Sequence, residues 1–205
     1  MKNQYLLALL LLLSVQALAQ EQQPRKNDFG FSTRIFNSPA TPFIIMYKRT
    51  IREGLALRGG LNLTYTNTRN NLTDNTGYTD VTTYTIVPSV GLEWQKQIAN
   101  KLILYYGADL RLSLGSTRTE DHTGNVFLTV TTNDSNITTF SPLLGIRYAL
   151  MDRLYVATET NFNFNWTSTT NQRNTLATGV INTSSSNVFN MSLQPGLGLY
   201  LFYQF

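Results

Sequence analysis

The chain has 205 residues, with 16 Lys and Arg against 12 Asp and Glu and a formal net charge of +4. This length suits one domain and leaves no room for a separate catalytic module. The absence of cysteine excludes disulfides, a lipidated N-terminal cysteine and cysteine-ligated metal sites. The basic residues form no cluster anywhere along the chain, so the composition gives no indication of nucleic-acid binding.

The N-terminus has the three parts of a signal peptide. Lys2 supplies the positive charge, residues 6–13 the apolar core, and Ala17-Leu18-Ala19 the small-residue cleavage signal. The apolar run is shorter than the roughly 20 residues that a membrane-spanning helix needs, which argues against an uncleaved anchor. We expect cleavage after Ala19. The expected domains are a cleaved signal peptide over 1–19, a flexible lead-in over 20–27 and one folded domain over 28–205.

From residue 28 onward, apolar and polar residues alternate in a way that predicts β-strands. Alternation is most extended in 189–205, where the odd positions are apolar and the even positions mainly polar or small. A strand sends alternate side chains to opposite faces, so this pattern suits lipid on one side and a polar interior on the other. The eight expected strands are 28–36, 41–49, 54–66, 82–97, 101–116, 137–150, 153–167 and 188–205.

The expected connections differ in length on the two sides. Those after the second, fourth and sixth strands are short (50–53, 98–100, 151–152), whereas those after the third, fifth and seventh are long and rich in Thr, Asn and Ser (67–81, 117–136, 168–187). This asymmetry is typical of outer-membrane barrels. The sequence therefore predicts an all-β fold, an eight-stranded antiparallel up-and-down transmembrane β-barrel with short periplasmic turns and long extracellular loops.

A short motif recurs about once per hairpin and supports this interpretation. Its form is Pro, any residue, apolar, Gly, and it occurs as Pro88 with Gly91, Pro142 with Gly145, and Pro195 with Gly198; Pro42 is a degraded copy without the glycine. Proline removes a ladder hydrogen bond, and glycine relieves crowding inside a narrow barrel. We interpret these six residues of the complete copies as bend positions.

Charged residues fall on one face of the expected strands, which we assign to the barrel interior. A soluble β-barrel would have an apolar interior instead. The inward set is Arg34, Arg58, Glu93, Asp109, Arg111, Arg147 and Glu159, with Lys48 undecided because the second strand has no clear facing. Buried charges must be paired. We predict a lumen ion-pair network with Arg58–Glu93 and Arg147–Glu159 as cross-strand pairs and Arg34 close enough to join.

With the signal peptide, strand count, loop asymmetry and C-terminal Leu201-Phe202-Tyr203-Gln204-Phe205, the chain resembles the small eight-stranded outer-membrane β-barrels, a porin-like group that includes the OmpA-type transmembrane domain. The repeat resembles barrels of Bacteroidota-type bacteria. The resemblance implies a location in the cell outer membrane, and contact with outer-membrane lipids and, during biogenesis, with periplasmic chaperones and the β-barrel assembly machinery. It also implies that Tyr203 and Phe205 form the assembly signal.

No catalytic or cofactor site is expected, and no metal site. The single histidine, His122, lies beside Glu120 and Asp121 in an expected polar loop without a nearby serine at a strand end. We predict a non-enzymatic protein with a structural or surface-interaction role and a filled, charged lumen. Three alternatives stay open: a narrow channel for small or hydrophobic solutes, similar to the OmpW type, a lipid-modifying enzyme, and a subunit of a secretion or motility assembly. The sequence does not identify a ligand for the loops.

Overall fold

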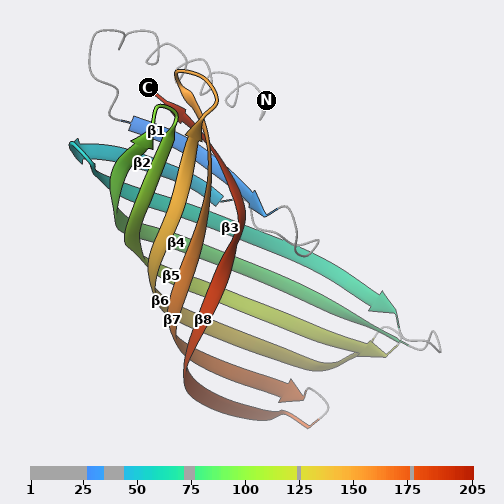
Figure 1. Ribbon diagram of the computed structural model, residues 1–205. Coiled ribbons are helices and arrows are strands. Elements are labelled where there is room, and N and C mark those ends of the chain that lie inside the picture. Colours follow the sequence, from blue (N-terminus) through green and yellow to red (C-terminus); the bar gives the residue numbers. More distant parts are fainter. Residues whose placement is uncertain (1–26, 35–43, 72–76, 124–125, 176–177) are drawn as a thin grey trace.

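The computed structural model describes residues 27–34, 44–71, 77–123, 126–175 and 178–205. These residues form eight antiparallel strands that close into one barrel in the order β1-β2-β3-β4-β5-β6-β7-β8 (Figure 1). The predicted fold class is therefore confirmed. The strands are β1 (Asn27–Arg34), β2 (Ile44–Arg52), β3 (Leu55–Asn71), β4 (Gly77–Ala99), β5 (Leu102–Thr123), β6 (Val126–Ala149), β7 (Leu154–Thr175) and β8 (Val180–Gln204).

The barrel closes where the first and last strands pair. The β1–β8 ladder runs from the pair Asp28 and Gln204 to the pair Arg34 and Gly198. Beyond it, the backbone NH of Phe205 donates to Asn27 O at 2.9 Å. The expected signal peptide and lead-in lie outside the described residues except for Asn27, which is already the first residue of β1.

Short connections lie at the end of the barrel where β1 begins and β8 ends (Figure 1). β2 and β3 are joined by Glu53 and Gly54, and Gly54 has a left-handed φ of 70° that suits a glycine. β4 and β5 are joined by Asn100 and Lys101. These turns lie within a few residues of the predicted ones.

At the other end, the segments predicted as long loops are mainly strands. β3 continues to Asn71 and β4 begins at Gly77, while β5 and β6 are separated only by 124–125 and β7 and β8 only by 176–179. These segments are mainly polar on both faces, so they lack the sustained apolar alternation by which strands are found in a sequence. Their many β-branched threonines nevertheless favour strand. The expected loops 67–81, 117–136 and 168–187 are corrected accordingly.

The strands differ greatly in length, and the difference divides the molecule in two. β1 and β2 have 8 and 9 residues, whereas β6 and β8 have 24 and 25. β2 pairs with β3 only as far as Ile44 with Asn62. Beyond that pair, the described pairing continues only from β3 through to β8 (Figure 1). We call this six-stranded part the extension; it comprises residues 64–71, 77–85, 115–123, 126–135, 169–175 and 180–186.

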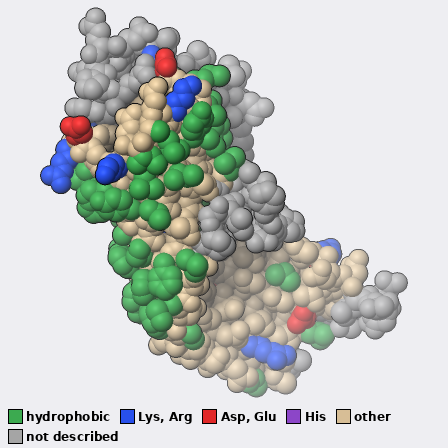
Figure 2. Space-filling view, viewed as in Figure 1, with side chains coloured by type: hydrophobic (Ala, Val, Ile, Leu, Met, Phe, Trp, Pro, Cys, Tyr) green, Lys and Arg blue, Asp and Glu red, His purple; other side chains and the backbone are tan. Residues whose placement is uncertain are grey.

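The two faces of the barrel have opposite polarity. Large apolar side chains such as Val90, Leu110 and Leu144 are exposed on the outside. Figure 2 shows them as a nearly continuous green band on the visible side of the barrel, while uncharged polar side chains and backbone dominate the extension. Charged side chains are buried on the inside, among them Arg58, which is 2% exposed. Within the described part of the chain, no helix is long and apolar enough to cross a membrane.

At two prolines of the repeat, the pairing of the strand with one of its two neighbours is interrupted. The β4–β5 partners step from Ile86 with Leu114 to Ser89 with Arg111, passing over Pro88. The β6–β7 partners likewise pass over Pro142. Missing pairs at these positions follow from the absent proline N–H.

Glycines let neighbouring strands and inward side chains approach closely on the inner face of the barrel. A Cβ added to Gly145 would overlap the Tyr105 ring, and one added to Gly91 would overlap the Asp109 carboxylate. At Gly107 the obstacle is the Leu92 backbone carbonyl, which cannot turn aside as a side chain can. These positions therefore require the absence of a side chain.

Replacing Gly107 tests this packing. We expect Gly107→Ala to lower the free energy of unfolding by about 1–3 kcal/mol, because the added methyl group forces β4 and β5 apart. The measurement is urea unfolding of the refolded protein in lipid vesicles, followed by tryptophan fluorescence.

The matched control is Gly59→Ala. The nearest atom to its added Cβ is Ser89 O at 3.8 Å, an ordinary contact. This variant should stay within about 0.5 kcal/mol of the parent protein. Equal effects of the two substitutions would contradict the packing argument.

Candidate functional site: a buried ion-pair layer in the lumen

Arg58 lies at the centre of the barrel interior and contacts three carboxylates. Its Nη1 donates to Glu93 Oε2 at 3.0 Å, its Nε lies 3.1 Å from Asp109 Oδ1, and its Nη2 lies 3.1 Å from Glu159 Oε2. The three acids come from β4, β5 and β7, so one guanidinium connects strands on different sides of the barrel. The structure thus brings the expected Arg58–Glu93 pair together and adds two further partners.

Lys48 completes this cluster from β2. Its Nζ donates to Glu93 Oε2 at 2.6 Å and lies over the rings of Tyr105 and Phe202, 4.7 and 4.3 Å from their centroids. The aromatic faces therefore add cation–π attraction to the ion pair. The inward facing of Lys48, which the sequence left undecided, follows from its 1% exposure. We call Lys48, Arg58, Glu93, Asp109 and Glu159 the ion-pair layer.

Neutral donors satisfy further carboxylate oxygens in this layer. Tyr200 Oη donates to Glu159 Oε1 at 2.9 Å, and Tyr105 Oη donates to Glu159 Oε2 at 3.3 Å. Gln95 Nε2 donates to Glu93 Oε1 at 2.7 Å. Buried carboxylates are tolerated when their oxygens are bonded in this way. The arrangement stabilises charges that are engaged with one another rather than held ready for a substrate.

The predicted Arg147–Glu159 pair is wrong. Arg147 Nη1 donates instead to Asp28 Oδ2 on β1, and its guanidinium lies 3.8 Å from the centroid of the Tyr155 ring. Two features explain why Arg147 binds Asp28 and not Glu159. Glu159 is already bound by Arg58, and the Tyr105 ring fills the space beside Gly145, the residue of β6 that pairs with Glu159. In an eight-stranded barrel the interior is narrow enough for side chains to meet across it.

Arg111 also departs from the expected network. Its Nη2 donates to Ser141 Oγ and, at 2.8 Å, to Asn163 Oδ1. Among the described residues, no carboxylate lies within ion-pair distance of Arg111. It therefore stands apart from the ion-pair layer as a cation held by neutral groups.

Other predicted site residues occupy simpler positions. The side chain of Arg34 lies outside the described residues, as do the side chains of Pro195 and Gly198, although β8 passes through both of the latter. Tyr203 points outward and is half-exposed, and Phe205 ends the chain beside Asn27. Sequence reasoning missed Asp28, Gln95 and the two tyrosines as members of the network; their inward positions in alternating strands were the available signal.

His122 lies in the extension, on its outer face. Its ring stacks on that of Tyr78 with centroids 4.3 Å apart, and its Nε2 lies 3.8 Å from Glu120 Oε2. Next to it, Arg69 donates to both oxygens of Asp80 at 2.7 and 2.8 Å, which lowers the pKa of the Asp80 carboxyl. The histidine is therefore a buried strand residue, 6% exposed, and does not lie in the expected solvated loop. The described residues contain no group of three or more potential ligands that could hold a metal.

No family model matches the sequence, and no curated protein matches it. Among solved structures, the chain is similar to a major outer membrane protein from Thermus thermophilus, with a TM-score of 0.61 and 12% identity over 89% of this chain and 100% of that chain. It also matches Neisserial surface protein A, with a TM-score of 0.39 and 17% identity over 88% of this chain and 94% of that one. The first of these similarities shows that the chain has the fold of an outer-membrane β-barrel protein.

Proposed function

We propose that the protein is an integral outer-membrane β-barrel without enzymatic activity, whose lumen is closed by the ion-pair layer and whose role is structural or depends on its exposed extension. The observation that carries this proposal is the inverted polarity of the barrel, apolar outside and charged inside. In water, that distribution leaves a broad apolar band exposed, whereas lipid removes it from water.

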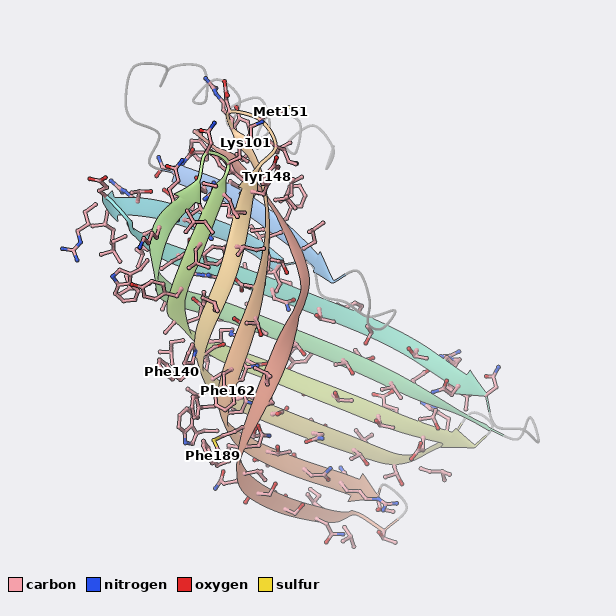
Figure 3. The ribbon with its side chains drawn as sticks, viewed as in Figure 1. Lys101, Phe140, Tyr148, Met151, Phe162 and Phe189 are labelled. Atoms are coloured by element: carbon pink, nitrogen blue, oxygen red, sulfur yellow. The ribbon has the colours of Figure 1, made fainter. Side chains whose placement is uncertain are left out.

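Aromatic side chains flank the apolar band, as expected at two membrane interfaces. Tyr148 lies toward the turn end, and Phe140 and Phe189 lie on the outside near the extension (Figure 3). Trp94 and Tyr106 stack on the outer face with centroids 5.9 Å apart. We infer that the turns face the periplasm and that the extension stands beyond the outer leaflet.

The ion-pair layer argues for a structural barrel over a narrow channel. Lys48, Arg58 and Glu93 are at most 2% exposed, so their side chains fill the lumen at this level. An ion passing through would have to separate oppositely charged groups that were desolvated on folding. The proposed partners are therefore the surrounding lipids, the assembly machinery during insertion, and molecules that reach the extension.

Placing a charge on the apolar band tests the membrane location. Leu110 is half-exposed on the outer face of β5. We expect Leu110→Arg to destabilise the inserted barrel by about 2–4 kcal/mol, because the guanidinium would face hydrocarbon. The measurement is the fraction of heat-modifiable, folded protein in the outer-membrane fraction.

Gln172→Arg is the matched control. Gln172 lies on the outer face of the extension and is exposed. This variant should fold and insert like the parent chain. If Leu110→Arg behaved in the same way, the proposed membrane position of the band would be wrong.

Conductance separates the closed barrel from the channel. We expect the purified protein in planar lipid bilayers to give no steady single-channel steps, because the ion-pair layer blocks the lumen. Reproducible steps of uniform size from the unmodified protein would instead favour the narrow channel.

Removing Arg58 tests the importance of the ion-pair layer. We expect Arg58→Ala to lower the free energy of unfolding by about 3–5 kcal/mol, because three buried carboxylates lose their shared cation. The measurement is urea unfolding in lipid vesicles.

Arg118→Ala provides the control for charge removal. Arg118 pairs with Glu120 at 2.6 Å on the surface of the extension, where its side chain is 58% exposed. Exposed pairs contribute less than about 1 kcal/mol. Similar losses for Arg58→Ala and Arg118→Ala would contradict a special role for the buried layer.

A further inference from the structure

Arg111 occupies the boundary between the ion-pair layer and the extension. On β5 it follows Asp109, the last acid of the layer, on the same inward face. Farther along β5, the inward positions include Thr117 and Thr119, which belong to the extension. Arg111 therefore lies where the lumen lined by buried charges gives way to a mainly uncharged polar wall. Among the described residues, the charged inward positions farther along this wall are Asp121 on β5 and Arg173 on β7.

The guanidinium of Arg111 is held in place by neutral groups. Nη2 donates to Ser141 Oγ and Asn163 Oδ1, and the Ser141 hydroxyl donates to the same Asn163 oxygen at 2.7 Å. Ser141 and Asn163 are buried, at 0% and 4% exposure, whereas Arg111 keeps part of its surface open. The structure therefore contains an oriented cation that is reachable but not neutralised by direct contact.

The nearest acid is already engaged. Asp109 lies 3.1 Å from Arg58 Nε, and the other two carboxylates of the layer are bound by Arg58, Lys48 and tyrosine hydroxyls. Among the described residues, no carboxylate lies within ion-pair distance of Arg111, and Asp109 acts on it only from farther away. An anion that approached Arg111 would gain a charge-assisted hydrogen bond without breaking an existing ion pair.

The wall above Arg111 consists mainly of hydroxyl and amide groups. Thr139 Oγ1 donates to Asn165 Oδ1 at 2.8 Å, and Asn165 Nδ2 donates to Asn190 Oδ1 at 2.7 Å. Thr83 and Thr117 are joined at 3.1 Å farther into the extension. Such groups both donate and accept hydrogen bonds, which suits a ligand that carries many hydroxyls.

Access is from the extension side. The described pairing there runs only from β3 to β8, and Figure 2 shows this part as a hollowed surface in which uncharged polar atoms predominate. On the turn side, the ion-pair layer fills the lumen. The turn side is therefore closed to a ligand, and an approach to Arg111 would be from the extension side.

From this arrangement we propose that Arg111, oriented by Ser141 and Asn163, is the anion-binding residue of a site for acidic saccharides, which are hydroxylated molecules with one carboxylate or phosphate. Arg111 binds the anionic group, and the hydroxyl and amide wall binds the sugar hydroxyls. This goes beyond the proposed function, because a closed outer-membrane barrel needs no such ligand.

The test measures D-glucuronate binding to the full-length protein refolded in phosphatidylcholine vesicles, with D-glucose as the neutral probe. We expect saturable binding of glucuronate and at least tenfold weaker binding of glucose, since one charge-assisted hydrogen bond corresponds to about a tenfold or greater change in affinity. Arg111→Gln should weaken glucuronate binding to the level of glucose. Arg118→Gln, on the outer face of the same strand, should leave it unchanged.

A second variant keeps the test decisive if Arg111→Gln does not fold. Asn163→Asp places a carboxylate next to Arg111 Nη2, which lies 2.8 Å from the present amide oxygen. We expect this variant to bind glucuronate at least tenfold more weakly while unfolding at a higher temperature. Unchanged binding in either variant, or equal binding of glucose and glucuronate, would overturn the proposal.

Competition identifies the source of the saccharide. Lipopolysaccharide incorporated in the vesicles should displace glucuronate if the natural ligand is a membrane glycolipid; if it does not, a free acidic sugar is the ligand. Neither result depends on conductance, so a failure of this site and a failure of the closed-barrel proposal remain distinguishable.

Discussion

The buried contact between Arg58 and its three carboxylates is the interaction on which the rest of the structure depends. Each of these charges was solvated in the unfolded chain, and removing it from water is costly unless a partner compensates. Arg58 compensates three acids from three strands at once. The strands must therefore pair in one order and one register, because a shift of the register by one residue would turn a charged side chain toward the apolar outer face.

The close packing of the inner face follows from the same requirement. Eight strands leave an interior only wide enough for side chains, and several large ones must meet at one level. Tyr105 reaches Glu159 by passing through the space that a side chain at position 145 would occupy. Asp109 similarly uses the space beside Gly91. The glycines of the repeat are thus linked to the ion-pair layer, since they provide the room that its members use.

Strand number, order and facing could be predicted from the sequence because lipid and lumen impose a strict alternation along each strand. Lys48 escaped this reasoning because the expected second strand had no consistent apolar face. The Arg147–Glu159 pair failed for a different reason: comparing depths along neighbouring strands ignores contacts across a narrow interior, where Arg58 reaches Glu159 first. The extension was mistaken for loops because strands that are polar on both faces carry no apolar alternation.

The position of the ion-pair layer gives the two ends of the barrel different properties. Between the layer and the turns, the interior is packed with aromatic rings, and Phe202 and Tyr105 both contact the Lys48 ammonium. Beyond the layer, the inner wall continues mainly as hydroxyl and amide groups along six strands. A closed lumen needs only the ion-pair layer and the aromatic packing between this layer and the turns. Among the described residues, the extension adds backbone hydrogen bonds but contributes no residue to the buried apolar core, so burial of apolar side chains does not account for the length of its six strands.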